Sequence, residues 1–534
     1  MTKTRNAVEN GLIDMRDNWL RATQEAADSR LLLWRMRGNA MRMLDVFFEA
    51  QKQAGDWSVP DMFLNLDANF DTSYGYSREL KESLLMSYSA SRSQFIEEGA
   101  ERWNGAIESH PDTAKGVIAL VGSFAKSHEQ FFRSAVLVVN PTSVFSPEAL
   151  ERWVEDALAG GMPQGVRLCL IDDQESRRWD RLLNRHESLA RVIESNTDMF
   201  DIARDTAAQS GGDGPTVAFR TMLADLMTLL EKAPAAQFGV RSDRAMQLAA
   251  RQQWHDQQAL LHMMAGGAWL KEQQYADAIA RYRQALACAT TARDQGHAGG
   301  TNLMMQAWMS EAGAWLAAKQ FDKAAHAYRS AAAAANAIPN AMFVIEGLRM
   351  AAFCESRLHQ DAKSRETLLQ AVAEGKHMAP VDRPMTTLPF VFQDLLKLQD
   401  NDRAVRLEKL ADVYKSNIDL AHATAESSAQ RLGANPSRQQ IEQIDVTLLQ
   451  SCEQAFMHFG HEREKLISAS DEFFRKVVAV ARDLLNPGWN GLPEVKHPTD
   501  KEVPEWSSPP AYAVMPNGSA LDADTATLPL AGTG

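Results

Sequence analysis

The chain has 534 residues, of which 45% are hydrophobic and 23% are charged, and its formal net charge at pH 7 is −13. This length is too great for one ordinary domain, and the composition is that of a soluble globular protein. The acidic balance argues against non-specific nucleic-acid binding, which needs clustered lysine and arginine. We therefore expect several domains and no nucleic-acid partner.

The amino-terminal segment and the cysteines bear on location. The first residues carry charges throughout, and no stretch approaches the roughly 18 apolar residues that a membrane helix needs. The four cysteines, Cys169, Cys288, Cys354 and Cys452, lie far apart in the chain and lack zinc-binding spacing. They are expected to be buried free thiols, which suits a reducing compartment. The sequence thus predicts a cytoplasmic protein without membrane span, metal or other cofactor.

The hydrophobic pattern of the first 209 residues changes at about residue 56. Residues 1–55 are expected to be helical, because apolar side chains recur at three- and four-residue spacing between Leu31 and Phe48. This apolar stripe is assigned to a core, with a membrane-surface role as the alternative. In residues 56–209, short apolar runs at 62–66, 135–139, 166–171 and 191–193 alternate with helical stretches. This alternation implies parallel βαβ units and hence an α/β module.

Helical patterns fill residues 210–380, and two of them place small and large residues at identical spacings. These positions are Gly266, Trp269, Tyr275, Ala278 and Tyr282 in the first stretch, and Ala312, Trp315, Phe321, Ala324 and Tyr328 in the second. Small residues let two antiparallel helices approach closely, and large residues fill the space beside them. Over about residues 255–375 this arrangement resembles the tetratricopeptide repeat (TPR).

The resemblance to the TPR implies helix pairs that stack into a superhelix, with the first helix of each pair lining a concave groove that holds a protein or peptide client. A third, degenerate pair is expected at residues 343–373, and an upstream pair at about 216–255. The groove residues that the resemblance implies are Met263, Lys271, Gln306, Met309, Arg349 and Phe353. Such a groove suits an amphipathic or partly acidic peptide. The alternative is that flanking domains of the same chain fill the groove.

The remainder of the chain has two parts. Residues 389–485 are expected to form a long helical hairpin, packed as an antiparallel coiled coil that offers a surface for oligomerisation. Its segments, 389–432 and 437–485, would be roughly 65–75 Å long at about 1.5 Å per residue, and apolar residues at heptad-like spacing run from Leu448 to Val480. Residues 487–534, rich in proline and poor in large aliphatic residues, are expected to be disordered.

The apolar run that ends at Asp172 and Asp173 is the feature most suggestive of catalysis. It resembles a Walker B strand, whose acid holds Mg²⁺ on a nucleotide. No G-x-x-x-x-G-K-[ST] phosphate loop accompanies it, because Leu120 and Ala125 replace the glycines required before Lys126 and Ser127. Asp172 and Asp173 are therefore either an acid pair that ends a buried strand or a relic nucleotide site. The order of elements is similar to that of signalling NTPases that join an ATPase module to a superhelical sensor.

No other catalytic pattern is complete, and isolated histidines such as His262, His326 and His359 are expected on helix faces. The predicted fold is mainly α: a TPR-like superhelix, a small parallel α/β module that resembles a degenerate NTPase domain, and a long-helix hairpin. The predicted function is that of a non-enzymatic scaffold, adaptor or chaperone for a protein client, associated with a bacterial secretion or toxin-delivery assembly. The alternative is an NTPase-like signalling switch with a TPR sensor.

Overall fold

The computed structural model describes residues 6–25, 28–97, 99, 102–195, 197–209, 214–433 and 435–485. The chain divides into two compact units, one made of residues 1–211 and 419–451 and the other of residues 212–418 and 452–534. No helix among the described residues is long and apolar enough to cross a membrane. The tail predicted to be disordered, residues 487–534, lies outside the described residues.

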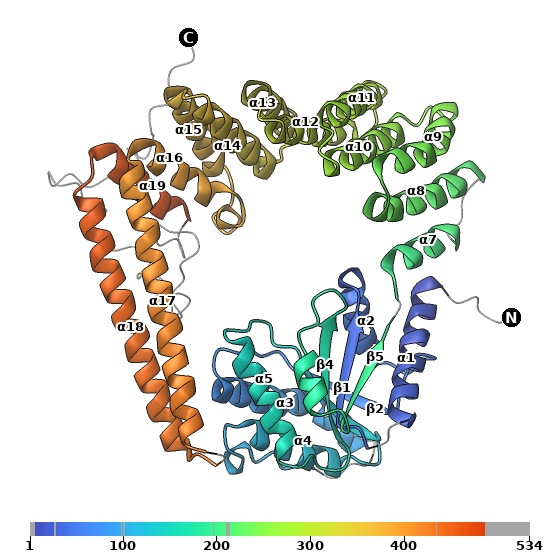
Figure 1. Ribbon diagram of the computed structural model, residues 1–534, viewed down its shortest axis with the longest axis vertical. Coiled ribbons are helices and arrows are strands. Elements are labelled where there is room, and N and C mark those ends of the chain that lie inside the picture. The colour runs from blue at the N-terminus through green and yellow to red at the C-terminus, as the bar shows by residue number, and fades with distance from the viewer. Residues whose placement is uncertain are drawn as a thin grey trace. The chain divides into compact units, whose positions relative to one another are not determined.

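The first unit is built on a five-stranded, all-parallel sheet with the strand order β2-β3-β4-β1-β5 (Figure 1). The strands are β1 (Leu31–Met36), β2 (Asp61–Asn65), β3 (Ser134–Val139), β4 (Val166–Asp173) and β5 (Ala190–Glu194). The predicted combination of a mostly helical chain with a small parallel α/β module is confirmed.

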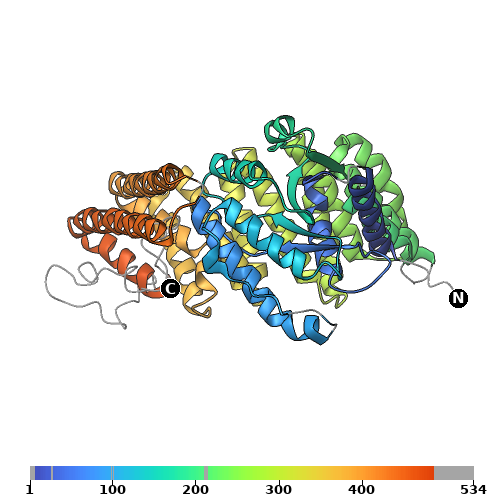
Figure 2. The same ribbon diagram turned by 90° about the horizontal axis from the view of Figure 1, so that it is seen from below.

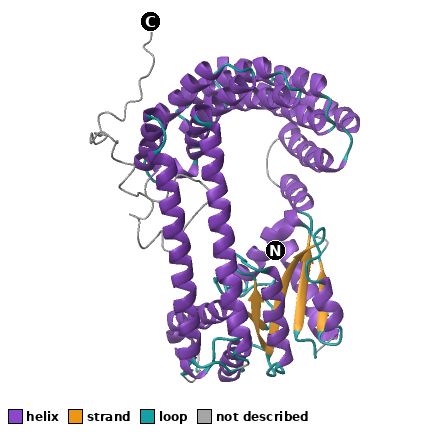
Figure 3. Ribbon diagram, turned by 60° about the vertical axis from the view of Figure 1, so that its left-hand side comes forward, coloured by secondary structure: helices purple, strands orange, loops and turns teal. Residues whose placement is uncertain are grey.

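Helices cover both faces of the sheet (Figure 3), which gives three layers. One layer contains α1 (Ala7–Glu25), α2 (Met41–Ala50) and α7 (Met199–Gln209). The other contains α3 (Ser73–Glu97), α4 (Ala114–Ser127), α5 (Pro147–Ala159) and α6 (Asp180–Arg185). Along β1, Leu31 and Leu33 face the second layer, while Leu32 and Trp34 face the first. This alternation with a period of two, buried on both faces, is what a central parallel strand requires.

The expectation that residues 1–55 are wholly helical is wrong for residues 31–36. These residues form the central strand β1, and all six are buried. A fully buried parallel strand is apolar at every position, so its sequence pattern cannot be distinguished from one side of a buried helix. The helices that flank this strand, α1 and α2, lie where the pattern places helices.

The second unit begins with nine consecutive described helices. They are α8 (Gly214–Lys232), α9 (Ala235–Arg251), α10 (His255–Lys271), α11 (Tyr275–Asp294), α12 (Gly300–Ala317), α13 (Phe321–Ala337), α14 (Ala341–Arg357), α15 (Asp361–Lys376) and α16 (Leu388–Gln399). In Figure 1, α10, α12 and α14 form one row, and α11, α13 and α15 form a second row along its outer side. This two-row stack is the TPR-like superhelix that the sequence predicts.

Two long helices, α17 (Asn401–Arg431) and α18 (Arg438–Ser468), lie side by side as a hairpin (Figure 2), and α19 (Glu472–Leu485) follows. Each long helix has 31 residues, or about 46 Å at 1.5 Å per residue, so the predicted length of 65–75 Å is wrong. The predicted segments are interrupted between α16 and α17 and between α18 and α19, where a new helix begins at an N-cap. The carboxylate of Asp400 accepts the N–H of Arg403 at 2.9 Å, and that of Asp471 accepts the N–H of Phe474 at 2.8 Å.

Candidate functional site

The two helices of each predicted TPR pair are joined by the same three-residue turn. Its middle residue is left-handed in every pair, with φ of 61° at Gln273, 58° at Lys319 and 58° at His359. In each turn the N–H of the third residue donates to a carbonyl in the last turn of the first helix, at 2.9 Å. A turn of this conformation at Gln253 also joins α9 to α10. The repeat in sequence is therefore matched by a repeat in backbone conformation.

These turns fix which residues correspond between the pairs. The N–H groups of Gln274, Gln320 and Gln360 donate to the carbonyls of Trp269, Trp315 and Glu355, respectively. The third pair thus has a glutamate at the position where the first two have tryptophan. The sequence alone indicates this correspondence, because Ala352 and Glu355 have the same spacing as Gly266 and Trp269.

The residues of the predicted repeat core lie between the paired helices. Ala278 and Ala324 have no exposed surface, and Tyr282 and Tyr328 are buried. A Cβ atom on Gly266 would lie 2.5 Å from a ring carbon of Tyr282, so this position requires glycine. The remaining aromatic residues are half-buried against the same clusters: Trp269, Tyr275, Trp315 and Phe321. Steric complementarity between small and large residues therefore sets the distance between the helices.

The six predicted groove residues lie on α10, α12 and α14, the helices of one row. Met263 and Met309 are half-buried against the cores of their own helix pairs. Phe353 is 43% exposed. Gln306 is exposed, and its side-chain amide donates to Asn302 one turn earlier at 3.1 Å. Of these four residues, Phe353 and Gln306 are exposed, whereas the two methionines pack partly inward.

The two cations predicted for the groove are engaged within the protein. The ammonium group of Lys271 donates to the carbonyl of Glu231 at 2.5 Å. The guanidinium of Arg349 lies 3.4 Å from a carboxylate oxygen of Asp394 and 5.4 Å from the ring centroid of Phe390, both on α16. Arg349 therefore joins α14 to α16, and the part of the row that is open to a partner is less basic than the sequence suggests.

A glycine near the middle of this row has open space where a side chain would begin. A Cβ atom added to Gly313, in the interior of α12, would meet nothing within 4 Å. The preceding pair has Gly267 at the corresponding position, where only the Tyr282 hydroxyl comes as close as 4.0 Å. The third pair has the exposed Phe353 there. The internal packing of the protein thus explains Gly266 but not Gly313.

Two buried carboxylates, which sequence reasoning missed, link one pair to the next. Glu311 on α12 is 3% exposed and accepts from Arg283 on α11 at 2.9 Å. Glu355 on α14 is fully buried and forms an ion pair with Arg329 on α13. Both arginines follow the buried tyrosine of their helix, so the Tyr-Arg dipeptide was the available sequence signal. These ion pairs favour one register between successive pairs.

The predicted relic nucleotide site lies at the carboxyl ends of the strands, where parallel sheets commonly bind ligands. Asp172, the residue before the last of β4, is 4% exposed and lies 3.1 Å from the guanidinium of Arg35 on β1. Arg35 also pairs with Asp180 at 2.5 Å. Burial alone would lower the pKa of Arg35, but hydrogen bonds to Asp180 and Asp172 outweigh burial and raise it. Asp172 is therefore paired with a permanent cation of the chain itself, which it shares with Asp180 and Glu194.

The neighbouring crevice, of about 380 Å³, is lined by charges of both signs. Asp45 and Asp173 line it and would repel an anion, whereas Arg178, which also lines it, would attract one. The loop after β1, which contains η1 (Gly38–Ala40), has a single glycine, and a Cβ atom there would lie 3.1 Å from a carboxylate oxygen of Asp173. Lys126 and Ser127, the nearest sequence match to a phosphate loop, close helix α4 instead of opening one.

Among the described residues, the cysteines and histidines are dispersed over the fold. Cys169, Cys354 and Cys452 are buried and Cys288 is half-buried, and all four are free. Burial raises the pKa of the Cys169 thiol to about 12, which keeps it protonated. Burial lowers the pKa of His262 to about 4, while His326 and His359 are exposed. Within the described ranges, no group of three or more histidine, cysteine or acidic side chains could hold a metal ion.

No family model matches the chain, and no curated protein sequence matches it. Among solved structures, the chain is similar to a Signal Transduction ATPase with Numerous Domains (STAND) protein with a tetratricopeptide repeat sensor from Pyrococcus horikoshii. The two share 8% sequence identity with a TM-score of 0.21, and the alignment covers 88% of this chain and 86% of that chain.

Proposed function

We propose that this protein is a non-enzymatic scaffold that binds a protein client on the face formed by α10, α12 and α14. The observation that carries the proposal is the unexplained Gly313 beside the half-buried Met309, with the exposed Phe353 at the corresponding position of the next pair. The α/β module has a structural role in this proposal, because Arg35 pairs with Asp172 and the loop after β1 lacks the glycines of a phosphate loop.

Gly313 supports a binding role because it lowers the stability of its helix and no packing within the protein compensates for that loss. A glycine in a helix interior destabilises the helix by roughly 0.5–1 kcal/mol relative to alanine. At Gly266 the close packing of Tyr282 offsets this destabilisation. A Cβ atom added to Gly313 would meet nothing within 4 Å. Bare backbone at this position lets a second chain approach closely. Methionine and phenylalanine beside it suit the apolar side of an amphipathic helix or an extended peptide.

Substitutions on this face test the proposal against a client captured by the purified protein from its native organism. Gly313→Gln should keep or slightly raise the melting temperature, because it removes a helix-interior glycine into open space. It should also weaken client binding by blocking the close approach. Met309→Glu with Phe353→Glu should weaken binding at least roughly 100-fold, since central apolar anchors commonly contribute about 2 kcal/mol or more each.

A matched control is Val240→Glu, which changes a 73% exposed apolar residue on α9, outside the row. It should leave client affinity unchanged. Arg349→Ala is unsuitable as a control, because it would also remove the link to Asp394. Unchanged affinity in the folded Gly313→Gln and Met309→Glu/Phe353→Glu variants would exclude this face as the client site. The proposal includes a role in a bacterial secretion or toxin-delivery assembly, which the identity of the client and the neighbouring genes would test.

The alternative function is an NTPase-like signalling switch with the repeats as its sensor. The parallel sheet with a crevice of about 380 Å³ at the carboxyl ends of its strands is the observation that favours it. Titration calorimetry with ATP or GTP and Mg²⁺ separates the two functions, and the scaffold proposal expects no binding. Tight binding that Asp173→Asn abolishes would establish the alternative. Asp172→Ala, tested in parallel, also removes a partner of Arg35.

A further inference from the structure

The first unit contains a second segment of the chain, which lies far beyond the α/β module in the sequence. Residues 419–451, here called the hairpin tip, comprise the end of α17, the connecting turn and the start of α18. They belong to the same compact unit as residues 1–211. The contacts of the hairpin tip with the module determine whether this association is permanent or reversible.

The main contacts of the hairpin tip are with α3 and involve charged groups. A carboxylate oxygen of Glu426 accepts the backbone N–H of Ser73, in the first turn of α3, at 2.9 Å. This N–H is one of those that a helix start leaves without an intrahelical partner. One turn further along α3, the guanidinium of Arg78 donates to Asp445 at 2.8 Å. The same guanidinium donates to Asp112, which precedes α4, at 3.0 Å.

The remaining contacts include some apolar packing, because Tyr74 on α3 and Ile441 on α18 line the same cavity and are each 2% exposed. The ring of His422 stacks on Phe145, with centroids 4.5 Å apart. Arg438 lies 3.6 Å from Glu108, but these side chains are 72% and 82% exposed, so water and salt screen the pair. Even the Arg78–Asp445 pair is about one-third exposed, at 34% and 35%.

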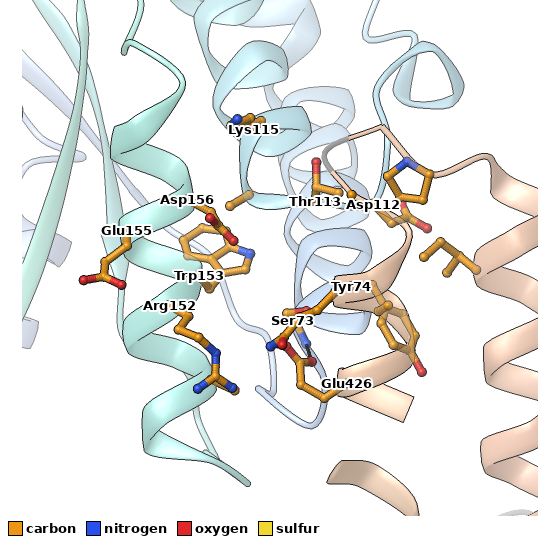
Figure 4. A pocket seen from close by; sticks show the side chains of 17 residues that line it. Ser73, Tyr74, Asp112, Thr113, Lys115, Arg152, Trp153, Glu155, Asp156 and Glu426 are labelled. Atoms are coloured by element: carbon orange, nitrogen blue, oxygen red, sulfur yellow. Dashed lines mark hydrogen bonds between the residues drawn. The ribbon is translucent and has the colours of Figure 1, made fainter. Parts of the chain in front are cut away.

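Cavities lie on two sides of these contacts. The first, of about 460 Å³, opens between the hairpin tip and α3, α4 and α5, and its lining includes Lys115, Trp153, Glu426 and Ile441. Figure 4 shows Glu426 beside Ser73, with Trp153 and Lys115 on the helices opposite. The second, of about 620 Å³, lies between the connecting turn and the segment that includes η2 (Ile107–Ser109). An interface that combines part-exposed ion pairs, a few buried apolar side chains and cavities on two sides resembles a transient interface more than a domain core.

We propose that the hairpin tip is a reversible latch, held on α3 by charge, whose release opens the 460 Å³ cavity while the α/β module stays folded. Salt should weaken the latch, because the part-exposed pair of Arg78 and Asp445 is screened at high ionic strength. The sheet, whose strands are buried between two helical layers, should not respond.

Hydrogen exchange measured by mass spectrometry on the full chain tests the latch. The Ser73 amide is the direct reporter, because Glu426 protects it only while the hairpin tip is docked. Raising NaCl from about 0.1 M to 1 M shortens the Debye length from about 10 Å to about 3 Å. We expect exchange in the peptide containing Ser73 to rise several-fold, with exchange in β3 unchanged. Trypsin should also cut faster after Arg431 and Arg438, on either side of the turn.

Variants separate the latch from general unfolding. Asp445→Asn and Glu426→Gln should each give, at low salt, the fast Ser73 exchange that the native protein shows at high salt. Glu442→Gln is the matched control, because Glu442 is on the same helix but pairs with Arg438 and not with the module. Slow Ser73 exchange at 1 M NaCl and in both variants would overturn the proposal. So would exchange in β3 that rises together with exchange at Ser73.

Discussion

The N–H of Ser73 and the carboxylate of Glu426 form a 2.9 Å hydrogen bond between residues 353 positions apart in the chain. Thr72, which precedes Ser73, caps α3 locally by accepting the N–H of Gly75 at 3.1 Å. Two backbone N–H groups at the start of α3 thus have hydrogen-bond acceptors, one from the local cap Thr72 and one from the remote carboxylate of Glu426. The local cap persists if the remote one leaves, so α3 can remain helical when the hairpin tip undocks.

Mild acid should weaken docking of the hairpin tip through His422. Burial lowers the pKa of His422 from its ordinary value of 6.5, although the charges of Asp71 and Asp419 and a hydrogen bond with the Asp71 backbone act in the opposite direction. The undocked histidine therefore binds a proton that the docked one does not. Docking stability is fully present above pH 6.5 and falls as the pH drops below it.

The measurement is Ser73 exchange in the native protein relative to His422→Phe at the same pH, which removes the intrinsic pH dependence of exchange. Phenylalanine preserves stacking on Phe145 but does not titrate. The ratio should be below one at pH 7.5, because phenylalanine loses the hydrogen bond with the Asp71 backbone, and it should rise several-fold at pH 5.5. A ratio that stays constant between these pH values would show that His422 does not contribute to the pH response.

Overpacking should destabilise the repeats at two corresponding positions. Ala278 and Ala324 have no exposed surface where paired helices approach most closely. Leucine at either position should lower the free energy of unfolding by about 1–3 kcal/mol, because the helices must move apart to admit it. Ala280→Leu is the control, since Ala280 is on the same helix as Ala278 but exposed. Equal melting temperatures for all three variants would refute the close-approach assignment.

Glycine should stabilise the left-handed turns. Gln273, Lys319 and His359 adopt φ values near 60°, where a Cβ atom is strained. Each change to glycine should raise the free energy of unfolding by up to about 1 kcal/mol, because relief of strain outweighs the added freedom of the unfolded chain. Ala318→Gly, at φ of −75°, should instead be destabilising. Chemical denaturation of the single variants measures both signs.

Removal of Arg329 should destabilise the third pair more than removal of Arg283 destabilises the second. Glu355 is fully buried and keeps only Lys363, at 3.3 Å, and the Thr367 hydroxyl when Arg329→Met removes its main partner. We expect a loss of about 2 kcal/mol, reduced from the value for a fully buried pair because Arg329 is 33% exposed. Arg283→Met should cost less than about 1 kcal/mol, because Arg283 is 60% exposed and Glu311 keeps the Trp315 indole N–H.

Side-chain periodicity made the repeats predictable, because their spacing of small and large residues is local in the sequence. The same approach failed at β1, where burial on both faces removes the polar positions that distinguish strand from helix. The role of Arg35 was not predictable either. It depends on β1 lying between β4 and β5, which brings Asp172 and Asp180 to one side chain. Gly313 appeared in the sequence as one small residue among several, and only the packing around it shows that it has no internal partner.

The discontinuity of the first unit has a consequence for biosynthesis. About 240 residues separate residue 211 from the end of the hairpin tip at residue 451. A ribosome adding roughly 5–20 residues per second needs about 10–50 s to make them. During that interval the nascent α/β module presents Phe145 and the N–H of Ser73 without their later partners. A chaperone that recognises this surface would distinguish unfinished chains from complete ones, and premature termination would leave the surface permanently exposed.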